Sequence, residues 1–556
     1  MRTRPIFTYQ TRSLLDPAQF SALDAYAELY GRAERSLFGA IQAGATLNDI
    51  KRAFLPRFGI SSRQFNAMRI GLDGKIASIK ERRPELIAEA EARIKKAAKV
   101  IRNLEVKLPG SCKLHQKKRR LATMQHRLAA MKVDHAAGTI RLCFGRKKLF
   151  HAQFNLAANG YASHDGWKSQ WEQARSSQFF MLGSQDETAG NQSCQAQVAD
   201  DGSFNLQIRL PDALAAHGKH IVLSNVRFAY GHEAIKAALD SSARIHCQTK
   251  AGAPTVKRIG TALSYRFVRD GAGWRIFVSV EARPVATTSR KELGAIGIDI
   301  NADHLALSET DRFGNLFKVR RIDLLTYGKT TDQAKALIGD AAVLIVAQAH
   351  AAGKSVVMEA LNFQKKKAEL ETVKSKQSRL LSSFAYGKVV SSIKAAAFRA
   401  GVEVIEVNPA YTSVIGAVNH AQAKGISIHQ GAAYAIARRG LGLSERPTVR
   451  AACVPTRNGG HVTFALPARN RAKHEWRQPF MHGKKSFAVW SFWSKVRTSL
   501  AAAHAAHFRC GAAKIAPPPL SPARPVVSPA WNSTVRSRGA NRSQHCSESV
   551  WPDVPF

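Results

Sequence analysis

Apolar residues near the start of the chain recur every three to four positions, which is the spacing of one helix face. Residues 17–45 carry such a stripe, and another follows Pro84, a residue that suits the first turn of a helix. The basic cluster KLHQKKRRL, at 113–121, opens a third helical segment. The stripe residues are Leu23, Tyr26, Leu29 and Tyr30, then Ile87, Ala90, Ile94, Ala97, Ile101 and Leu104. This pattern predicts that residues 15–132 are helical and basic.

The apolar period then changes to two, which is typical of strands with one buried face. Tight turns that contain Asp and Gly precede the clearest alternating segments. The alternating residues are Phe204, Leu206, Ile208 and Leu210, then Trp274, Ile276, Val278 and Val280. Segments 140–144 (IRLCF) and 221–230 add further strands, and 5–10 reads as one short strand. We therefore predict that 133–290 is a β-rich, antiparallel region.

From residue 291 onward, apolar strands and helices alternate. The predicted strands are 295–300, 304–308, 316–322, 355–360 and 402–407. The predicted helices cover about 332–351, 376–400 and 429–442, the last of these ending at glycine. Three strands followed by alternating helices and strands form an RNase H-like order. The chain is therefore predicted to be an α+β multidomain protein with an RNase H-like α/β domain over 291–511.

The remaining composition bounds the class of protein. Residues 512–556 are rich in Pro, Ser and Arg, which predicts a disordered tail. The seven cysteines include no CxxC pair, which argues against a disulfide framework or a zinc ribbon and fits a reducing cytoplasm. The N-terminal sequence does not resemble a signal peptide, and no run approaches the ~20 apolar residues of a membrane span. We expect a cytoplasmic, nucleoid-associated protein that does not bind a membrane.

Charge narrows the choice of partner. Lys and Arg number 83 and Asp and Glu number 40, which gives a formal net charge of +43. Such an excess favours a polyanion, and nucleic acid is the commonest one. A ribosome-like protein or a membrane-surface protein is the alternative explanation.

Three residues carry the candidate chemistry. Asp299 and Glu359 each end an apolar strand, and His429 opens a helix. Mg²⁺ prefers carboxylate oxygens, and two metal ions can stabilise the attacking and leaving oxygens of a phosphodiester. Histidine is a softer ligand that suits Mn²⁺ better, and it can also act as an acid or base near neutral pH. Taken singly, Asp299 also fits a turn or helix cap, Glu359 a buried acid with a partner, and His429 an ordinary helix start.

Four ordered segments resemble the TnpB proteins of bacterial transposons and their relatives, the type V CRISPR effectors. GIDINADHLALSETDRFGN (297–315) and VVMEALNFQKKK (356–367) resemble the first and second RuvC motifs of that family. VNPAYTS (407–413) is similar to its V-x-P-x-Y-T-S segment, and HQGAAYAIARR, from His429, to its third motif. IRLCFGRKKLF, ARSSQFFMLGSQDETAGNQSC and VRFAYGHEAI, within 140–235, resemble the transposon accessory proteins related to TnpB.

The resemblance implies a metal-dependent DNA endonuclease that a guide RNA from the transposon end directs to double-stranded DNA. Asp299, Glu359 and His429 would be its catalytic and metal-binding residues, with Mg²⁺ or Mn²⁺ as cofactor. Base pairing would read the sequence, while the protein reads a short adjacent motif. The implied architecture is a wedge-type β-barrel interrupted by a helical recognition lobe, followed by a RuvC domain. Its parts are 1–14 (first wedge strand), 15–132 (lobe), 133–290 (wedge), 291–511 (RuvC) and 512–556 (tail).

The sequence departs from the family pattern in two places. The family commonly carries a CxxC…CxxC zinc ribbon between the Tyr-Thr-Ser segment and the third motif, but only residues 414–428 lie there and they include no Cys. A zinc site is therefore not expected. His429 stands where the family's third motif usually has Asp, so the Asp-Glu-His set either binds metal or marks lost cleavage.

Several polar residues are candidates for contact with nucleic acid. The basic ones are Lys117, Lys118, Arg119, Arg120, Lys365, Lys366, Lys367, Arg438 and Arg439, and the others are Tyr411, Thr412 and Ser413. Basic side chains neutralise phosphates, although a solvated charged face explains any single one of them better. Arg438 and Arg439 can alternatively pair with acids, and the Tyr-Thr-Ser segment can serve loop packing.

Three other functions compete with guided cleavage. A nuclease-inactive, RNA-guided DNA-binding regulator shares every binding feature. An actin- or Hsp70-like ATPase also opens with a GIDI-type strand, but it needs later glycine-rich phosphate loops, which the sequence lacks. A transposase that joins strands cannot be deduced from these motifs.

Overall fold

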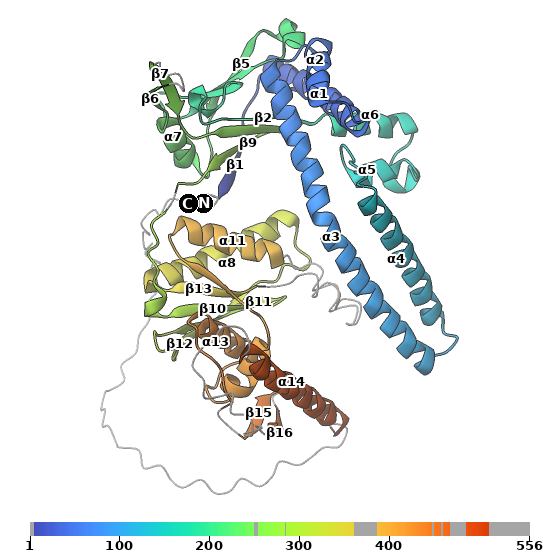
Figure 1. Cartoon of the computed structure of the whole chain (residues 1–556), viewed down its shortest axis with the longest axis vertical. Helices are drawn as coiled ribbons and strands as arrows, with labels where there is room; N and C mark the ends of the chain where they lie inside the picture. Colours follow the sequence, from blue (N-terminus) through green and yellow to red (C-terminus); the bar gives the residue numbers. More distant parts are fainter. Residues whose placement is uncertain are drawn as a thin grey trace, which may run out of the picture. The chain divides into compact units, whose positions relative to one another are not determined.

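The structure is a computed structural model that describes residues 5–248, 254–283, 285–360, 386–447, 450–456, 460–467 and 485–510. It is a mixed α/β protein with several sheets, divided into two compact units (Figure 1). The first unit comprises Met1–Ile94 and Leu108–Pro284, and the second comprises Lys95–Lys107 and the chain from Val285. The predicted tail after residue 511 lies outside the described residues.

The first unit opens with a strand and a set of helices. These are β1 (Ile6–Arg12), α1 (Pro17–Gln42), α2 (Leu47–Phe58), α3 (Ser62–Lys107) and α4 (Cys112–Ala136), of which the end of α3, Lys95–Lys107, is assigned to the second unit. Helix α1 begins with a capping box, in which Asp16 accepts a hydrogen bond from the backbone of Gln19 at 2.7 Å and the Gln19 side chain accepts one in return. The predicted stripe of α1 is buried, as its spacing requires.

Helix α3 differs from its prediction. The expected start after Pro84 is wrong, because the helix begins at Ser62 and Pro84 lies inside it. A proline inside a helix removes one backbone hydrogen bond and disfavours the helical conformation of the preceding residue, here Arg83. The Arg83 guanidinium donates to the carbonyls of Asp134 and Thr139, both at 2.7 Å, and Lys132 binds Glu91 at 2.6 Å. These contacts fasten α3 to the end of α4 around the proline.

Three antiparallel sheets follow in the first unit. They are β1-β9-β8-β2, β3-β4-β5 and the hairpin β6-β7. The new strands are β2 (Gln178–Met181), β3 (Cys194–Val198), β4 (Phe204–Arg209), β5 (His220–Val226), β6 (Ala243–Gln248), β7 (Pro254–Ile259), β8 (Leu263–Asp270) and β9 (Gly273–Glu281). Strand β1 pairs with β9 along its whole length, from Ile6↔Glu281 to Arg12↔Arg275.

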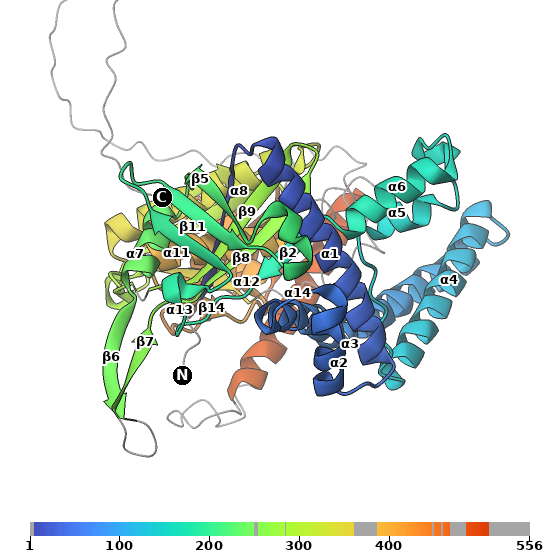
Figure 2. The ribbon, with the colours of Figure 1, turned by 90° about the horizontal axis from the view of Figure 1, so that it is seen from above.

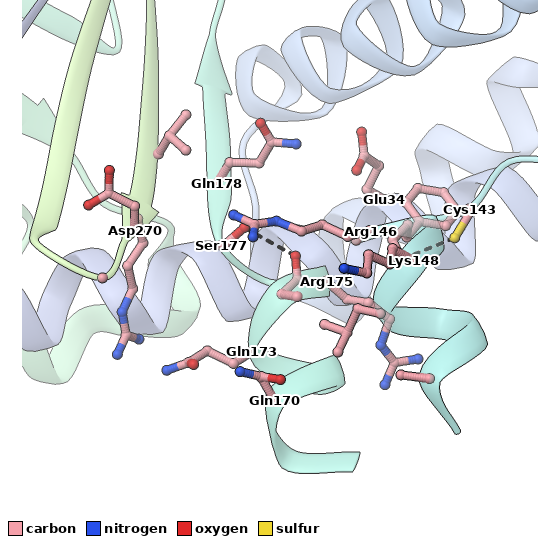
Figure 3. A pocket seen from close by; sticks show the side chains of 18 of the residues that line it. Glu34, Cys143, Arg146, Lys148, Gln170, Gln173, Arg175, Ser177, Gln178 and Asp270 are labelled. Atoms are coloured by element: carbon pink, nitrogen blue, oxygen red, sulfur yellow. Dashed lines mark hydrogen bonds between the residues drawn. The ribbon is translucent and has the colours of Figure 1, made fainter. Parts of the chain in front are cut away.

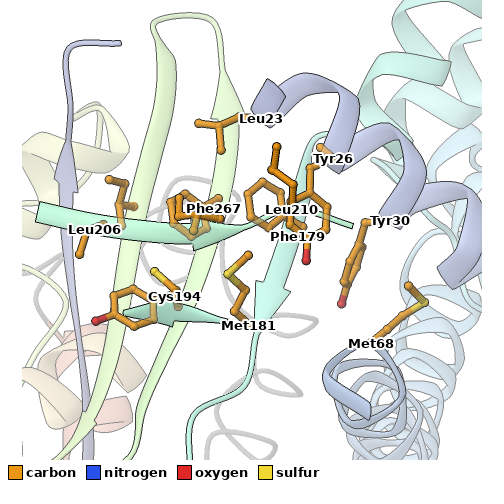
Figure 4. Packing of buried hydrophobic residues seen from close by; sticks show 14 of the residues in the cluster. Leu23, Tyr26, Tyr30, Met68, Phe179, Met181, Cys194, Leu206, Leu210 and Phe267 are labelled. Carbon is orange, nitrogen blue, oxygen red and sulfur yellow. The ribbon is translucent and has the colours of Figure 1, made fainter. Parts of the chain in front are cut away.

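The core of the first unit joins its helices to its sheets (Figure 4). Phe179 of β2 stacks between Tyr26 of α1 and Phe267 of β8, with ring centroids 4.3 Å and 4.7 Å apart. The alternating apolar residues predicted for 204–210 and 274–280 are all buried here. Period-two patterning therefore located β4 and β9 correctly.

Segment 140–144, predicted as a strand, is irregular. Its Leu142 and Phe144 pack against the core without pairing to a sheet. The alternation of apolar residues in this segment therefore comes from packing against the core and not from a strand. Short helices follow, and α5 and α6 contact each other (Figures 1 and 2). The bounds are α5 (Lys147–Ala152), η1 (Ala157–Asn159), α6 (His164–Arg175), η2 (Thr188–Gly190), η3 (Asp212–His217) and α7 (His232–Asp240).

The second unit is built on a five-stranded sheet in the order β12-β11-β10-β13-β14. Its strands are β10 (Ala295–Ile300), β11 (His304–Thr310), β12 (Leu316–Asp323), β13 (Ser355–Glu359) and β14 (Val404–Val407), after the short η4 (Lys291–Leu293). The first three strands are antiparallel, whereas β10, β13 and β14 are parallel. This is the predicted order of elements, and β10 has the predicted bounds.

Helices cover both faces of this sheet. Helices α8 (Thr331–Ala352) and α11 (Tyr386–Arg399) pack on one face against Ile296, Ile298 and Met358. Helix α13 (Ile428–Gly440) packs on the other face against Ala295 and Val357. The first part of the helix predicted at 376–400 lies outside the described residues.

The other elements of the second unit lie around α13. They are α12 (Thr412–Ile415), the π-helix η5 (Gly416–Ala421), β15 (Ala451–Pro455), β16 (His461–Ala465) and α14 (Lys485–Cys510). Trp493 of α14 is buried beside Ile415 and Ala435 in a separate small core. This cluster attaches β15, β16 and α14 to the helix that carries His429.

Among the described residues, helix α8 is long and apolar enough to span a membrane by length and composition alone. Its residues Ile338, Ile345 and Ala349 are buried against the sheet. A core helix of a globular domain has the same composition, because it is apolar on the face that it buries.

Gly297 provides a test of the packing of α13 on the sheet. A Cβ at this position would lie 2.0 Å from the carbonyl oxygen of Ala433 and 2.9 Å from the Cβ of Ala437. Gly297→Ala should therefore lower the free energy of unfolding by about 3 kcal/mol, as overpacking against backbone does. Denaturant unfolding measures the change. Gly339→Ala is the control, because Gly339 lies inside α8 and a Cβ there would have no atom within 4 Å. Its free energy of unfolding should rise by up to about 1 kcal/mol. Equal stability of the two variants would contradict the packing.

Candidate active site

Asp299 and Glu359 lie at the carboxyl ends of two neighbouring parallel strands. The register pairs Ile298 of β10 with Met358 of β13, and the two acids are the next residues along each strand. Because side chains alternate across a strand, both acids face away from the core under α8 and toward α13. The sequence therefore brings two carboxylates, 60 residues apart, to one edge of the sheet.

His429 joins them from the first turn of α13. A capping box between Ser427 and Gln430 fixes this helix start, and Ser308 of β11 donates to the Gln430 carbonyl at 2.7 Å. The His429 Nδ1 donates to Oδ2 of Asp299 at 3.1 Å. Its side chain is 39% exposed, whereas that of Asp299 is 11% exposed, so His429 forms the solvent side of the pair.

The connection between β10 and β11, with the first residue of β11, adds three polar residues that the sequence analysis missed. Asn301 donates its Nδ2 to Oδ2 of Asp299 at 2.9 Å. The buried His304 donates its Nδ1 to Asp303 at 2.8 Å, and its ring meets that of His429 edge to face, with centroids 4.9 Å apart. The available signal was their position, NADH, directly after the strand that carries Asp299.

The pKa values of Asp303 and Tyr386, both near Asp299, are shifted. Burial raises the pKa of Asp303, but the hydrogen bond and charge of His304 outweigh burial and leave that pKa below its usual value. Burial, and then the charges of Asp299 and Asp303, raise the pKa of Tyr386 to about 12. The Tyr386 hydroxyl therefore stays protonated beside a negatively charged edge.

Glu359 is held by the segment after β14. The Thr412 hydroxyl donates to Oε1 of Glu359, and Thr412 is 1% exposed. Tyr411, which precedes it, has a φ of 61°, in the left-handed region. Ser413 is exposed. Of the predicted Tyr-Thr-Ser contact residues, the structure thus places Thr412 on a catalytic candidate and leaves Ser413 open to solvent.

The two predicted arginines of α13 bind within the fold. Arg438 donates to Glu445 through Nε at 2.5 Å and to the Gly314 carbonyl through Nη1 at 2.7 Å. Arg439 donates to the Ala410 carbonyl at 3.0 Å. Burial lowers the pKa of Arg439, although the charge of Glu359 opposes this. These contacts match the alternative prediction, in which Arg438 and Arg439 bind groups of the protein itself.

The other predicted basic residues are distributed differently. Lys117, Lys118, Arg119 and Arg120 lie on α4, in the first unit, and all but Lys117 are exposed. Lys365, Lys366 and Lys367 lie outside the described residues. The candidate active site and the α4 cluster therefore belong to different units.

The donor atoms at the sheet edge suit a hard divalent cation, because carboxylate oxygens are its preferred ligands. Both carboxylates, however, already have protein partners: Asp299 binds Asn301 and His429, and Glu359 binds Thr412. Among the described residues, no three His, Cys, Asp or Glu side chains gather closely enough to hold a metal ion. The pair Asp299 and Glu359 thus fits such a cation in chemistry and strand position, while His429 is engaged with Asp299.

No protein-family model and no curated protein matches the sequence. The structure is similar to that of T. thermophilus RuvC in complex with a Holliday junction substrate, with 16% identity, a TM-score of 0.20, and 28% of this chain and 98% of that chain covered. It is also similar to a cryo-EM structure of a CRISPR-Cas12f ternary complex, with 10% identity, a TM-score of 0.18, and 80% of this chain and 100% of that chain covered. Both TM-scores are low, and the fold of this chain is defined by its own strand order and register.

Glu445, which binds His420 and Arg438, provides a test of the charged contacts around α13 through the pH dependence of stability. Burial raises its pKa, but hydrogen bonds and charges from His420 and Arg438 outweigh burial and leave that pKa below its ordinary value of 4.5. Ionised Glu445 therefore stabilises the fold above about pH 4.5, and this contribution is lost as the pH falls through the lower folded value. Glu445→Gln should cost roughly 1.5–3 kcal/mol at neutral pH.

Unfolding by denaturant at several pH values measures this cost. The gap between wild type and Glu445→Gln should narrow below pH 4.5. Asp323→Asn removes an exposed carboxylate from β12 and is the control, with a small effect throughout. A gap that stays constant with pH would show that Glu445 is not ionised in the fold.

Proposed function

We propose that this protein is a metal-dependent DNA endonuclease with a RuvC-like centre, guided by RNA in the manner of TnpB. One observation carries the proposal: Asp299 and Glu359 end adjacent parallel strands on the face where α13 presents His429. Carboxylates from rigid neighbouring strands are a suitable frame for phosphodiester hydrolysis with divalent metal.

In this proposal Asp299 and Glu359 hold Mg²⁺ or Mn²⁺, with His429 as the third member of the set. The cation would supply charge to stabilise the attacking and leaving oxygens. Asn301 and Thr412 orient the two carboxylates through the hydrogen bonds that they donate. His429, whose side chain is 39% exposed, can form hydrogen bonds beside the scissile bond.

RNA guidance and the finer architecture rest on the four sequence motifs and on charge. A net charge of +43 suits a guide RNA and double-stranded DNA as partners. The β1-β9-β8-β2 and β3-β4-β5 sheets would then belong to the wedge-type barrel, and the helices α1 to α4 to the recognition lobe. We extend the proposal to a cytoplasmic, nucleoid-associated location.

One observation favours the competing function, guided DNA binding without cleavage. Oδ2 of Asp299 already accepts hydrogen bonds from both Asn301 and His429. A cation that binds this oxygen must displace at least part of that network, which costs hydrogen bonds. A regulator would retain the network and use only the binding surfaces.

The test uses the purified full chain with RNA co-expressed from the DNA that flanks its gene, and a plasmid with a matched target. We expect cutting that requires Mg²⁺ or Mn²⁺ and that Asp299→Ala and His429→Ala each abolish. Thr412→Val keeps the shape of the side chain and removes the donor to Glu359, so it should reduce cutting by about 10–100-fold. Asp323→Ala, an exposed carboxylate on the same sheet, is the matched control and should cut normally.

Guide-dependent binding must be measured beside cutting. Tight binding of the matched target without cutting in either metal would reject the nuclease and support the regulator. Cutting that survives Asp299→Ala would place the catalytic centre elsewhere in the chain.

A further inference from the structure

A cavity of about 980 Å³ lies in the first unit, bordered by α1, α3, α6 and the hairpin of β8 and β9 (Figure 3). Its volume is at the upper end of the ~300–1,000 Å³ found for small-molecule sites. The residues of the candidate active site belong to the second unit and do not line it. The cavity is therefore a separate candidate binding site.

Positive side chains outnumber negative ones around this cavity. Two of the cations bind acids that also line it. These pairs are Lys75 with Glu34 at 2.6 Å and Arg275 with Asp270 at 2.9 Å. Arg146 and Lys148 are exposed and form no ion pair with any residue that the structure describes. The wall thus keeps two cationic groups available for an anion.

Arg175 also lines the cavity, and its guanidinium pairs with Glu172, with Nη2 and Oε1 3.7 Å apart. Arg35 donates from Nη1 to the Arg175 carbonyl at 3.3 Å. Burial lowers the pKa of Arg35, and the positive charge of Arg175 lowers it further. The excess of positive side chains around the cavity favours an anionic ligand.

The wall formed by α6 carries groups of another kind. Gln170 and Gln173 are exposed, and their spacing of three residues puts them on one helix face, where Figure 3 shows them next to each other. Each amide offers both donors and an acceptor. Tyr161, whose hydroxyl bonds to Gln170, and the ring of Phe144 also line the cavity. Amides beside aromatic rings are the chemistry that proteins use for the edge and face of a nucleobase.

The turn before α5 fixes the position of the cations. Gly145 has a φ of +86°, and a Cβ there would lie 3.0 Å from the ring of Trp171. Trp171 in turn stacks on Trp167, with the rings 10° from parallel. This packing sets where the chain enters α5 at Arg146.

We propose that the cavity binds one nucleotide of a single-stranded nucleic acid, with Arg146 and Lys148 at its phosphate and Gln170 and Gln173 at its base. A single strand fits because the base edge is open, whereas pairing and stacking cover it in a duplex. The guide RNA and a separated DNA strand offer the same nucleotide chemistry. The inference rests on the proposed function only in taking nucleic acid as the partner, and it does not require cleavage.

The experiment measures binding of the full-length chain to fluorescent single-stranded RNA and DNA of about 16 nucleotides, by anisotropy over a range of salt. Arg146→Ala with Lys148→Ala should weaken binding and lower the slope of log K against log salt by about 0.7, because the one phosphate in the cavity loses both of its cations. Gln170→Ala with Gln173→Ala should weaken binding and leave the slope unchanged, because amides release no counterions.

A matched control separates the cavity from general charge. Lys147→Ala with Lys168→Ala removes two exposed cations from α5 and α6 that do not line the cavity. This variant should bind nearly as the wild type does, and thermal unfolding should show that every variant is folded. The RNA and DNA arms show which strand supplies the nucleotide.

Three outcomes would overturn the inference. Equal losses in the Arg146/Lys148 and Lys147/Lys168 variants would mean that scattered charge binds the strand. Tight binding that no cavity variant changes would reject the cavity and leave the proposed function standing. Failure of the wild type to bind any RNA or DNA would reject both the cavity and the proposed function.

Discussion

The close contact between α13 and strand β10 is the constraint on which the candidate site depends. The backbone of α13 comes so near the sheet at Gly297 that no side chain fits there. Gly416 and Gly431 allow a second such approach, between η5 and α13, where a Cβ on Gly416 would lie 2.3 Å from the Ala432 nitrogen. The helix held at this distance places His429 against Asp299, with Nδ1 and Oδ2 3.1 Å apart.

This contact also explains which parts of the site the sequence could predict. Asp299 and Glu359 follow apolar strands, and strand periodicity with the family motifs located both of them. Their shared edge follows from parallel pairing, which the element order implies. The hydrogen bond from Thr412 to Glu359 and the contact between His304 and His429 depend on the exact approach of elements far apart in sequence. Periodicity contains no information on such distances.

The errors in the fold have similar causes. Pro84 is a sound local signal for a helix start, but contacts from Arg83 to the end of α4 override it. Segment 140–144 alternates like a strand, yet it finds no partner strand and ends at the turn of Gly145. The pairing of Arg438 with Glu445 shows the same limit for charge, because a basic residue on the helix of a candidate site residue can form its ion pair inside the fold.

The pairing of β1 with β9 has a consequence for synthesis of the chain. Ile6 emerges from the ribosome first, but its partner, Glu281, follows about 275 residues later. At translation rates of roughly 5–20 residues per second, the first strand waits about 14–55 s for its neighbour. During that time its backbone donors and acceptors have no sheet to join, and an unpaired strand invites association with other chains. The β1-β9-β8-β2 sheet therefore closes only late in translation, and the nascent chain needs protection until then.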